Sequence, residues 1–134
     1  MIHLDTNVVI ALLNNRPALV RERFEAARSA PMFMSIIVYH ELMYGAAASE
    51  RQRENEEKIA LFITSSRIEL LQFNEQDAKE AADIRAYLRK IAMPIGPYDV
   101  LIAAQTRRVG ATLVTANGRE FNRVKGLMVI DWAV

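Results

Sequence analysis

The stretch Met1-Ile2-His3-Leu4-Asp5-Thr6-Asn7 opens the chain, and an apolar, helix-like run at residues 8–13 follows it directly. A short strand therefore ends in an acid, a hydroxyl and an amide, immediately before a helix. In α/β proteins with parallel strands, ligands and chemistry collect at the carboxyl ends of the strands. We therefore expect Asp5 to lie at a functional edge of a sheet, with Thr6 or Asn7 capping the helix that follows.

Strand-like and helix-like segments alternate along the rest of the chain. Further strands are predicted at residues 32–34, 68–71, 111–115 and 127–130, and a loop at residues 116–121. Helical spacing of apolar residues predicts helices at residues 17–28, 36–44, 49–63, 74–91 and 97–110. This alternation predicts an α/β fold, with a central, mostly parallel sheet flanked by helices. No repeat or linker interrupts the chain, so we expect residues 1–134 to form a single domain.

Three polar residues mark where helices are expected to begin. Ser35 and Asn74 each precede an apolar helical run and are suited to the N-cap position. Ser49 has a glutamine three residues later, the pattern of a capping box. Gly45 is expected to end the helix that Ser35 begins.

Composition narrows the class of protein. The chain has 134 residues, is 51% hydrophobic and 25% charged, and is therefore typical of a folded domain. It has no cysteine, which excludes disulfides, thiolate catalysis and cysteine-bound zinc. No apolar run reaches the roughly 20 residues of a membrane span, and the N-terminus lacks the pattern of a secretory signal. We expect a cytoplasmic protein that does not bind a membrane.

The charge is nearly balanced overall but uneven along the chain. A net charge of +1 argues against an unselective nucleic-acid binder that relies on electrostatics. Basic residues nevertheless concentrate in the C-terminal part, at Arg107, Arg108, Arg119, Arg123 and Lys125. On charge alone, this basic rim is equally suited to steering a phosphate backbone and to ordinary solvation.

Four acids lie in or beside apolar segments rather than in solvated stretches: Asp5, Glu41, Asp99 and Glu120. Taken singly, each has an ordinary explanation, such as a cap, a helix-dipole partner or an exposed acid. Taken together, a parallel sheet would bring them to one edge, because strand ends and helix N-termini meet there. Clustered carboxylates repel one another and raise at least one pKa, and oxygen ligands of this kind suit Mg²⁺ or Mn²⁺.

Other kinds of site are less well supported by the sequence. His3 and His40 have no second histidine at ligand spacing, so we interpret both as structural. A phosphotransferase of the haloacid-dehalogenase type requires an acid and a threonine where this chain has Asn7 and Val9. The chain also has no glycine-rich phosphate loop, which argues against a nucleotide-binding enzyme.

An ordered set of short motifs resembles the PIN-domain ribonucleases, in particular the VapC toxins of bacterial toxin–antitoxin pairs. The likeness spans essentially the whole chain. Its pieces are Leu4-Asp5-Thr6-Asn7, Ser35 to Gly45 around Glu41, Ile95-Gly96-Pro97-Tyr98-Asp99, Ile102-Ala103-Ala104, Leu113-Val114-Thr115, Arg119-Glu120-Phe121, Val124 and Gly126-Leu127.

This resemblance implies a PIN-like three-layer sandwich and a metal-dependent endoribonuclease that leaves a 5′-phosphate. By position, Asp5, Glu41 and Asp99 match the three family acids and would hold Mg²⁺ or Mn²⁺. Many PIN domains place a further acid where this chain has Asn117, but a subgroup has an Arg-Glu-Phe run instead. We therefore assign the fourth acidic role to Glu120.

The resemblance also implies supporting residues and partners. Polar residues that support the acids are expected at Thr6, Asn7, Thr115 and Asn117, and contacts to RNA phosphates at Arg119 and Arg123. The implied partners are an RNA substrate, a VapB-like antitoxin that fills a hydrophobic groove, and a second copy in a homodimer. The RNA target is left open, with tRNA as one candidate. The alternative is a catalytically silent PIN-fold module that binds RNA or protein.

Overall fold

In the computed structural model, which describes residues 1–134, two helices follow each of the first three strands and one helix follows the fourth. The strands are β1 (Ile2–Leu4), β2 (Met32–Ser35), β3 (Glu69–Leu71), β4 (Thr112–Val114) and β5 (Met128–Ile130). The helices are α1 (Thr6–Asn14), α2 (Ala18–Ala26), α3 (Ile36–Ala47), α4 (Gln52–Ser66), α5 (Glu75–Lys90), α6 (Pro97–Arg108) and α7 (Gly118–Phe121). No helix combines the length and the apolar composition that a membrane span requires.

All five strands belong to one parallel sheet, in the order β3-β2-β1-β4-β5. The opening strand β1 is the central one, and its Ile2 pairs with Met32 on one side and Thr112 on the other. Because every strand runs in the same direction, all five carboxyl ends lie along one edge. The α/β fold and its parallel sheet are thus confirmed.

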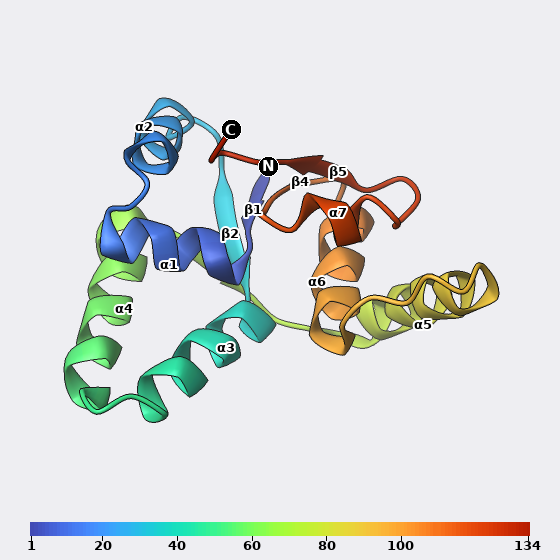
Figure 1. Cartoon of the computed structure of the whole chain (residues 1–134), viewed down its shortest axis with the longest axis horizontal. Coiled ribbons are helices and arrows are strands. Elements are labelled where there is room, and N and C mark those ends of the chain that lie inside the picture. The colour runs from blue at the N-terminus through green and yellow to red at the C-terminus, as the bar shows by residue number, and fades with distance from the viewer.

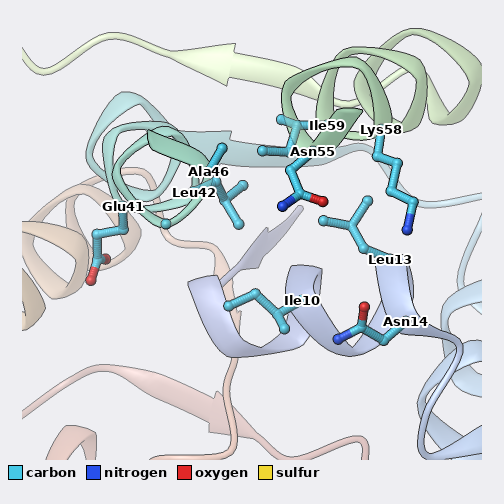
Figure 2. Close-up of a pocket in the computed structure, with 10 residues that line it drawn as sticks. Ile10, Leu13, Asn14, Glu41, Leu42, Ala46, Asn55, Lys58 and Ile59 are labelled. Carbon is cyan, nitrogen blue, oxygen red and sulfur yellow. The ribbon is translucent and has the colours of Figure 1, made fainter. Parts of the chain in front are cut away.

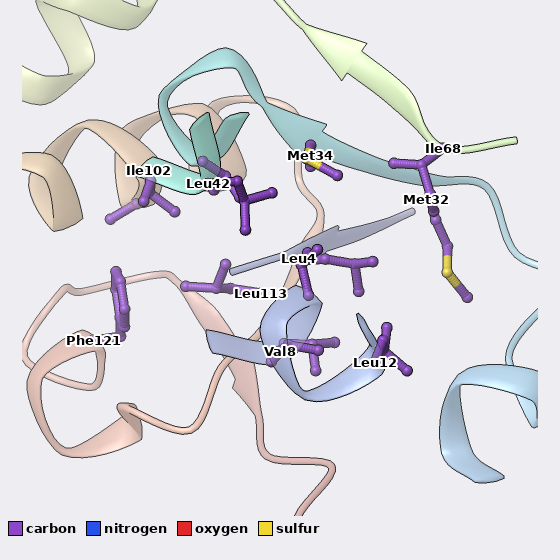
Figure 3. Close-up of a cluster of buried hydrophobic side chains, with 14 of the residues drawn as sticks. Leu4, Val8, Leu12, Met32, Met34, Leu42, Ile68, Ile102, Leu113 and Phe121 are labelled. Atoms are coloured by element: carbon purple, nitrogen blue, oxygen red, sulfur yellow. The ribbon is translucent and has the colours of Figure 1, made fainter. Parts of the chain in front are cut away.

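Helices flank the sheet on two sides. In Figure 1, α1 and α4 lie to the left of β1 and β2, while α5 and α6 lie to the right. Helix α1 packs against α2, α3 and α4, and α5 packs along α6. Figure 3 shows the core that these layers enclose, where Leu4 of β1 faces Val8 and Leu12 of α1. The central strand is therefore covered by the helix that follows it.

Two of the expected helix starts are confirmed. The Ser35 hydroxyl accepts a hydrogen bond from the Ile37 N–H and caps α3. The Asn74 side chain accepts from the Asp77 N–H, and the Asp77 carboxylate accepts from the Asn74 N–H, which completes a capping box for α5. Both caps satisfy N–H groups that a helix start leaves without partners.

Other boundaries differ from the sequence prediction. Asp5, not Thr6 or Asn7, is the N-cap of α1, because its extended backbone lets its carboxylate accept the Thr6 N–H at 2.8 Å. The Ser49 capping box does not form: its hydroxyl binds the Asn55 side chain, and α4 begins later. Helix α3 continues through Gly45 to Ala47, and the predicted loop at residues 116–121 contains the short helix α7.

Candidate acidic active site

Asp5 lies at the carboxyl end of the central strand and is almost fully buried. Its Oδ1 accepts a hydrogen bond from the Thr6 N–H at 2.8 Å, and its Oδ2 accepts one from the Thr115 hydroxyl at 2.7 Å. Burial raises the pKa of this carboxyl, the two hydrogen bonds oppose that rise, and the nearby charge of Glu41 adds to it. Both carboxylate oxygens are thus held in a fixed orientation.

Glu41 reaches the same edge from α3. The Thr6 hydroxyl donates a hydrogen bond to Glu41 Oε1 at 2.7 Å. Since the Thr6 backbone N–H binds Asp5, one residue connects two acids that are 36 positions apart in the sequence. The cap at Ser35 fixes where α3 begins, and with it the position of Glu41 one and a half turns later.

Asp99 lies in the first turn of α6, which begins with Pro97 at the helix start. The chain comes close to its carboxylate at Gly96, where a Cβ would lie 3.2 Å from Asp99 Oδ2. Burial, then the charges of Asp5, Glu120 and Glu41, raise the pKa of Asp99 to about 7, and a side-chain hydrogen bond with Glu120 adds to the shift. The pKa of Asp99 is therefore raised by burial first and by its acidic neighbours second, and the four acids lie close enough to act on one another.

Glu120 is held by the segment that follows β4. The Asn117 side chain donates to Glu120 Oε2 at 2.9 Å, and the Asn117 N–H donates to the Thr115 hydroxyl oxygen at 3.0 Å. That oxygen also donates its proton to Asp5, so Thr115 links the two ends of the acidic cluster. Asn7 contacts the same segment less closely, since its Oδ1 accepts from the Ala116 N–H at 3.4 Å.

No basic side chain neutralises this cluster. The chain has six ion pairs, and none of them includes Asp5, Glu41, Asp99 or Glu120. The acids do not form a complete ligand cage either: no three carboxylates or histidines place their donor atoms around one point. Hydrogen bonds fix three of the acids individually, and repulsion between like charges opposes closer approach. The donors are all oxygens, the ligand chemistry of a hard divalent cation such as Mg²⁺ or Mn²⁺.

The two expected RNA contacts occupy different environments. Arg119 is exposed on α7 and takes part in none of the ion pairs. Arg123 is half-buried, and its Nη1 donates to the Pro94 carbonyl at 2.9 Å. Arg119 is therefore the freer of the two cationic groups.

A second polar cluster, which the sequence did not reveal, surrounds His3 on the same strand, two residues before Asp5. His3 is fully buried: its Nε2 accepts from the Ser35 N–H at 3.0 Å, and its Nδ1 lies 2.6 Å from the Thr106 hydroxyl. Ser35 also binds Gln105, which donates to the Gln72 carbonyl at 3.1 Å. Burial lowers the pKa of His3 to about 3, so the ring is neutral. The structural interpretation of His3 is confirmed, and the one available clue was a glutamine within the apolar helix α6.

Comparison with known proteins places these features in a family. Residues 2–127 match the PIN domain. A tRNA(fMet)-specific endonuclease VapC from Shigella flexneri is 41% identical over 130 residues, which cover 97% of this chain and 96% of the relative.

Solved structures agree. A Rickettsia felis VapBC2 complex bound to a promoter DNA fragment contains a chain with a TM-score of 0.91 and 30% identity, covering 98% of this chain and 99% of that one. In a DNA-bound VapBC complex from Salmonella typhimurium, the values are 0.89 and 39%, with 98% and 97% covered. This chain belongs to the PIN-domain family and, within it, to the VapC ribonucleases.

Proposed function

We propose that this chain is a single PIN domain and the toxin of a toxin–antitoxin module, an endoribonuclease that depends on a divalent metal. The observation that carries the proposal is the meeting of Asp5, Glu41, Asp99 and Glu120 at one edge of the sheet, where no basic side chain pairs with them. Such a concentration of like charge is unfavourable for folding and favourable for binding a cation. The match to VapC ribonucleases over nearly the whole chain supports the same activity.

The acids have different roles in this proposal. Asp5, Glu41 and Asp99 would hold Mg²⁺ or Mn²⁺, and Thr6 and Thr115 orient two of these ligands through their hydroxyls. When bound, the cation polarises the scissile phosphate and lowers the pKa of the attacking water.

Glu120 orients that water and accepts its proton, while Asn117 fixes the Glu120 carboxylate. Attack of the water oxygen on phosphorus breaks the bond between phosphorus and the 3′-oxygen, which takes up a proton from solvent, so the products end in a 5′-phosphate and a 3′-hydroxyl.

The proposed substrate is RNA, with initiator tRNA as the first candidate. This choice rests on the relatives from Shigella flexneri and Salmonella typhimurium, each described as a tRNA(fMet)-specific endonuclease. Identity of about 40% over nearly the whole chain supports a shared type of substrate. We place the protein in the cytoplasm, with its RNA.

A VapB-like antitoxin is the proposed inhibitor, as in the VapBC complexes of similar structure. A groove of about 250 Å³ lies between α1, α3 and α4. Its lining includes the apolar side chains of Ile10, Leu13 and Ile59 (Figure 2). Glu41 lines the same groove. An apolar antitoxin segment in this groove would therefore also cover the acidic site. We further propose that the toxin is a homodimer.

Cleavage assays with matched variants test the activity. Wild-type protein should cut initiator tRNA in Mg²⁺ and not in EDTA, and Asp5→Asn should abolish cleavage. Asp83→Asn removes an exposed acid of α5 and should cut normally. Sequencing of the product ends locates the cut and identifies the 5′-phosphate.

Metal binding has its own measurement. Mg²⁺ or Mn²⁺ should raise the Tm of the wild type, because a ligand that binds only the folded state stabilises it. The shift should shrink in Asp5→Asn. Equal RNA cleavage by wild type and Asp5→Asn, or none by either together with no metal-dependent shift, would favour the catalytically silent binding module.

A further inference from the structure

Three aromatic rings stand exposed beside the acidic site. Tyr98 precedes Asp99 on α6 and is 45% exposed, and Tyr44 on α3 is 68% exposed. His40, one turn before Tyr44, is also exposed and packs edge-on against Tyr98, with ring centroids 5.6 Å apart and planes at 84°. Singly exposed rings are common on protein surfaces, but a group of adjacent exposed rings marks a candidate binding site.

The same rings line a cavity that is continuous with the acids. Its volume is about 380 Å³, and its walls are Thr6, His40, Glu41, Tyr44 and Tyr98. This volume falls in the range of roughly 300–1,000 Å³ typical of small-ligand sites. Thr6 and Glu41 are directly hydrogen-bonded to each other within the acidic cluster, so the cavity shares a wall with it.

We propose that this aromatic pocket, formed by His40, Tyr44 and Tyr98, binds an unpaired base of the RNA beside the scissile phosphate. The inference rests on the proposed endoribonuclease activity and specifies how its substrate is recognised. A nucleotide whose phosphate lies at the acids carries its base only one sugar away. The pocket is the adjoining cavity, and its exposed rings offer faces on which any base can stack.

Charge supports a base rather than a phosphate as the occupant. The pocket contains Glu41 and no lysine or arginine, so it would repel a second phosphate. With a net charge of only +1, the chain also has little capacity to hold RNA by electrostatics alone. Contacts to bases must then contribute to affinity, and uncharged aromatic surface supplies them without neutralising the metal-binding acids.

Tyr98 and His40 additionally offer polar groups at the edge of the pocket. The Tyr98 hydroxyl lies 3.4 Å from His40 Nε2, a contact loose enough for a base edge to replace. Stacking on these rings requires a base that is free of its helix. The preferred substrate is therefore a single-stranded loop or bulge and not a continuous duplex, since bases paired in a duplex cannot be splayed out onto a protein surface without unpairing.

Kinetics of ring variants test the pocket on initiator tRNA, the first substrate candidate. Tyr98→Ala should lower kcat/KM on the order of tenfold, mainly through KM, as expected for removing one stacking partner. Tyr98→Phe, which keeps the ring, should restore most of the loss. Tyr44→Ala should act in the same direction, and as a strongly exposed position it provides a variant that folds. The control is Tyr87→Ala, which removes a 37% exposed ring on α5 beside Lys125.

A modified substrate identifies what the rings contact. Replacing the base next to the cut by an abasic site should cost wild type about as much as Tyr98→Ala does, and should cost Tyr98→Ala little more, because the two changes remove the same contact. If 2-aminopurine replaces the base at that position, its fluorescence should be quenched when the RNA binds Glu120→Gln protein. Binding to the double variant Glu120→Gln/Tyr98→Ala should quench it less.

Three results would overturn the pocket assignment. One is unchanged kcat/KM in both alanine variants; another is a loss in Tyr98→Phe as large as in Tyr98→Ala. The third is a loss of antitoxin binding with normal RNA cleavage, which would make the rings a protein contact. Wild-type cleavage that Asp5→Asn abolishes shows in each case that the nuclease assignment stands even if the pocket does not.

Discussion

Two polar clusters share the central strand, one fully buried around His3 and one half-buried around Asp5, and they satisfy their polar groups in opposite ways. His3 belongs to a network in which donors and acceptors match, with Ser35, Gln105 and Thr106 as partners. Asp5, two residues later, belongs to a group of four acids with no cationic partner. The first cluster finds all its hydrogen-bond partners within the chain. The second lacks positive charge, which only another molecule can provide.

Burial of an acid alone does not mark the functional site. Asp77 is fully buried, but its carboxylate caps α5 and pairs with Arg108 at 2.5 Å. It resembles the His3 network in being satisfied internally. The distinguishing property of the acidic cluster is therefore uncompensated like charge at a strand end, and removing one member should have opposite effects in the two clusters.

Among the variants that distinguish the two clusters, the largest effect is expected from Glu41→Gln. Losing one metal-holding carboxylate should lower kcat/KM on the order of 10²-fold or more, because a divalent cation contributes several kcal/mol to such reactions. The free energy of unfolding in EDTA should stay the same or increase, since a repelling charge is removed. Denaturant unfolding and RNA cleavage measure the two quantities. Glu69→Gln, at an exposed position of β3, is the matched control. Normal cleavage by Glu41→Gln would contradict its metal-holding role.

Gln105→Leu should have the opposite profile. The substitution keeps the volume similar but leaves the Ser35 hydroxyl and the Gln72 carbonyl without their partner. Unsatisfied buried groups should cost roughly 1–3 kcal/mol of unfolding free energy, while kcat/KM of the folded protein changes little. Gln52→Leu removes an exposed hydrogen bond to Glu56 and should cost less than about 0.5 kcal/mol. If Gln105→Leu lost activity at full stability, the two clusters would not be separable in this way.

The pH dependence of stability separates the clusters a second time. The pKa of Asp99 is raised from 3.8 to about 7 in the folded protein. The folded state therefore keeps a proton that the unfolded state loses, and stability in EDTA falls as pH rises through this window. The pKa of His3 is lowered from 6.5 to about 3, so its contribution is lost as pH falls below 6.5. The two contributions oppose each other.

Asp99→Asn should remove the Asp99 contribution to the pH dependence of stability and leave that of His3. The unfolding free energy of the variant minus that of wild type should increase as pH rises from 3.8 towards about 7, and level off above that value. One proton gives a slope of at most about 1.4 kcal/mol per pH unit, and partial exposure of Asp99 reduces it. Denaturant unfolding in EDTA at several pH values gives this difference, and Mg²⁺ should reduce it. A difference that does not change with pH would show that burial and the neighbouring acids do not raise the pKa of Asp99.

The fold was predictable because short apolar runs mark the strands and apolar residues at helical spacing mark the helices. The apolar runs at residues 2–4 and 111–115 became neighbouring strands, and Ser35 and Asn74 capped their helices as expected. Asp5 and Asp99 were recognisable as acids at a strand end and a helix start. Helix α7 was not recognised, since four residues are too few to show a helical period.

What the sequence could not show are the contacts between distant segments. Nothing near Thr6 indicates that its hydroxyl binds Glu41, because the two meet only when α1 and α3 pack together. The Gln105–Ser35 pair likewise depends on how α6 crosses β2. Local pattern predicts which residues are polar and buried, whereas their partners are set by tertiary packing.

The smallest effect is expected at the basic rim, where Arg119 and Arg123 differ as the two clusters do. Arg123 is satisfied internally through the Pro94 carbonyl, while Arg119 is exposed and unpaired. Arg119→Ala should raise KM for RNA by roughly two- to fivefold at low salt. The slope of log KM against log salt concentration should decrease by about one, as expected for one lost phosphate contact. Arg123→Ala should change KM less. Cleavage kinetics across a salt series measure both, and identical KM values for wild type and Arg119→Ala at every salt concentration would make Arg119 a solvated surface residue.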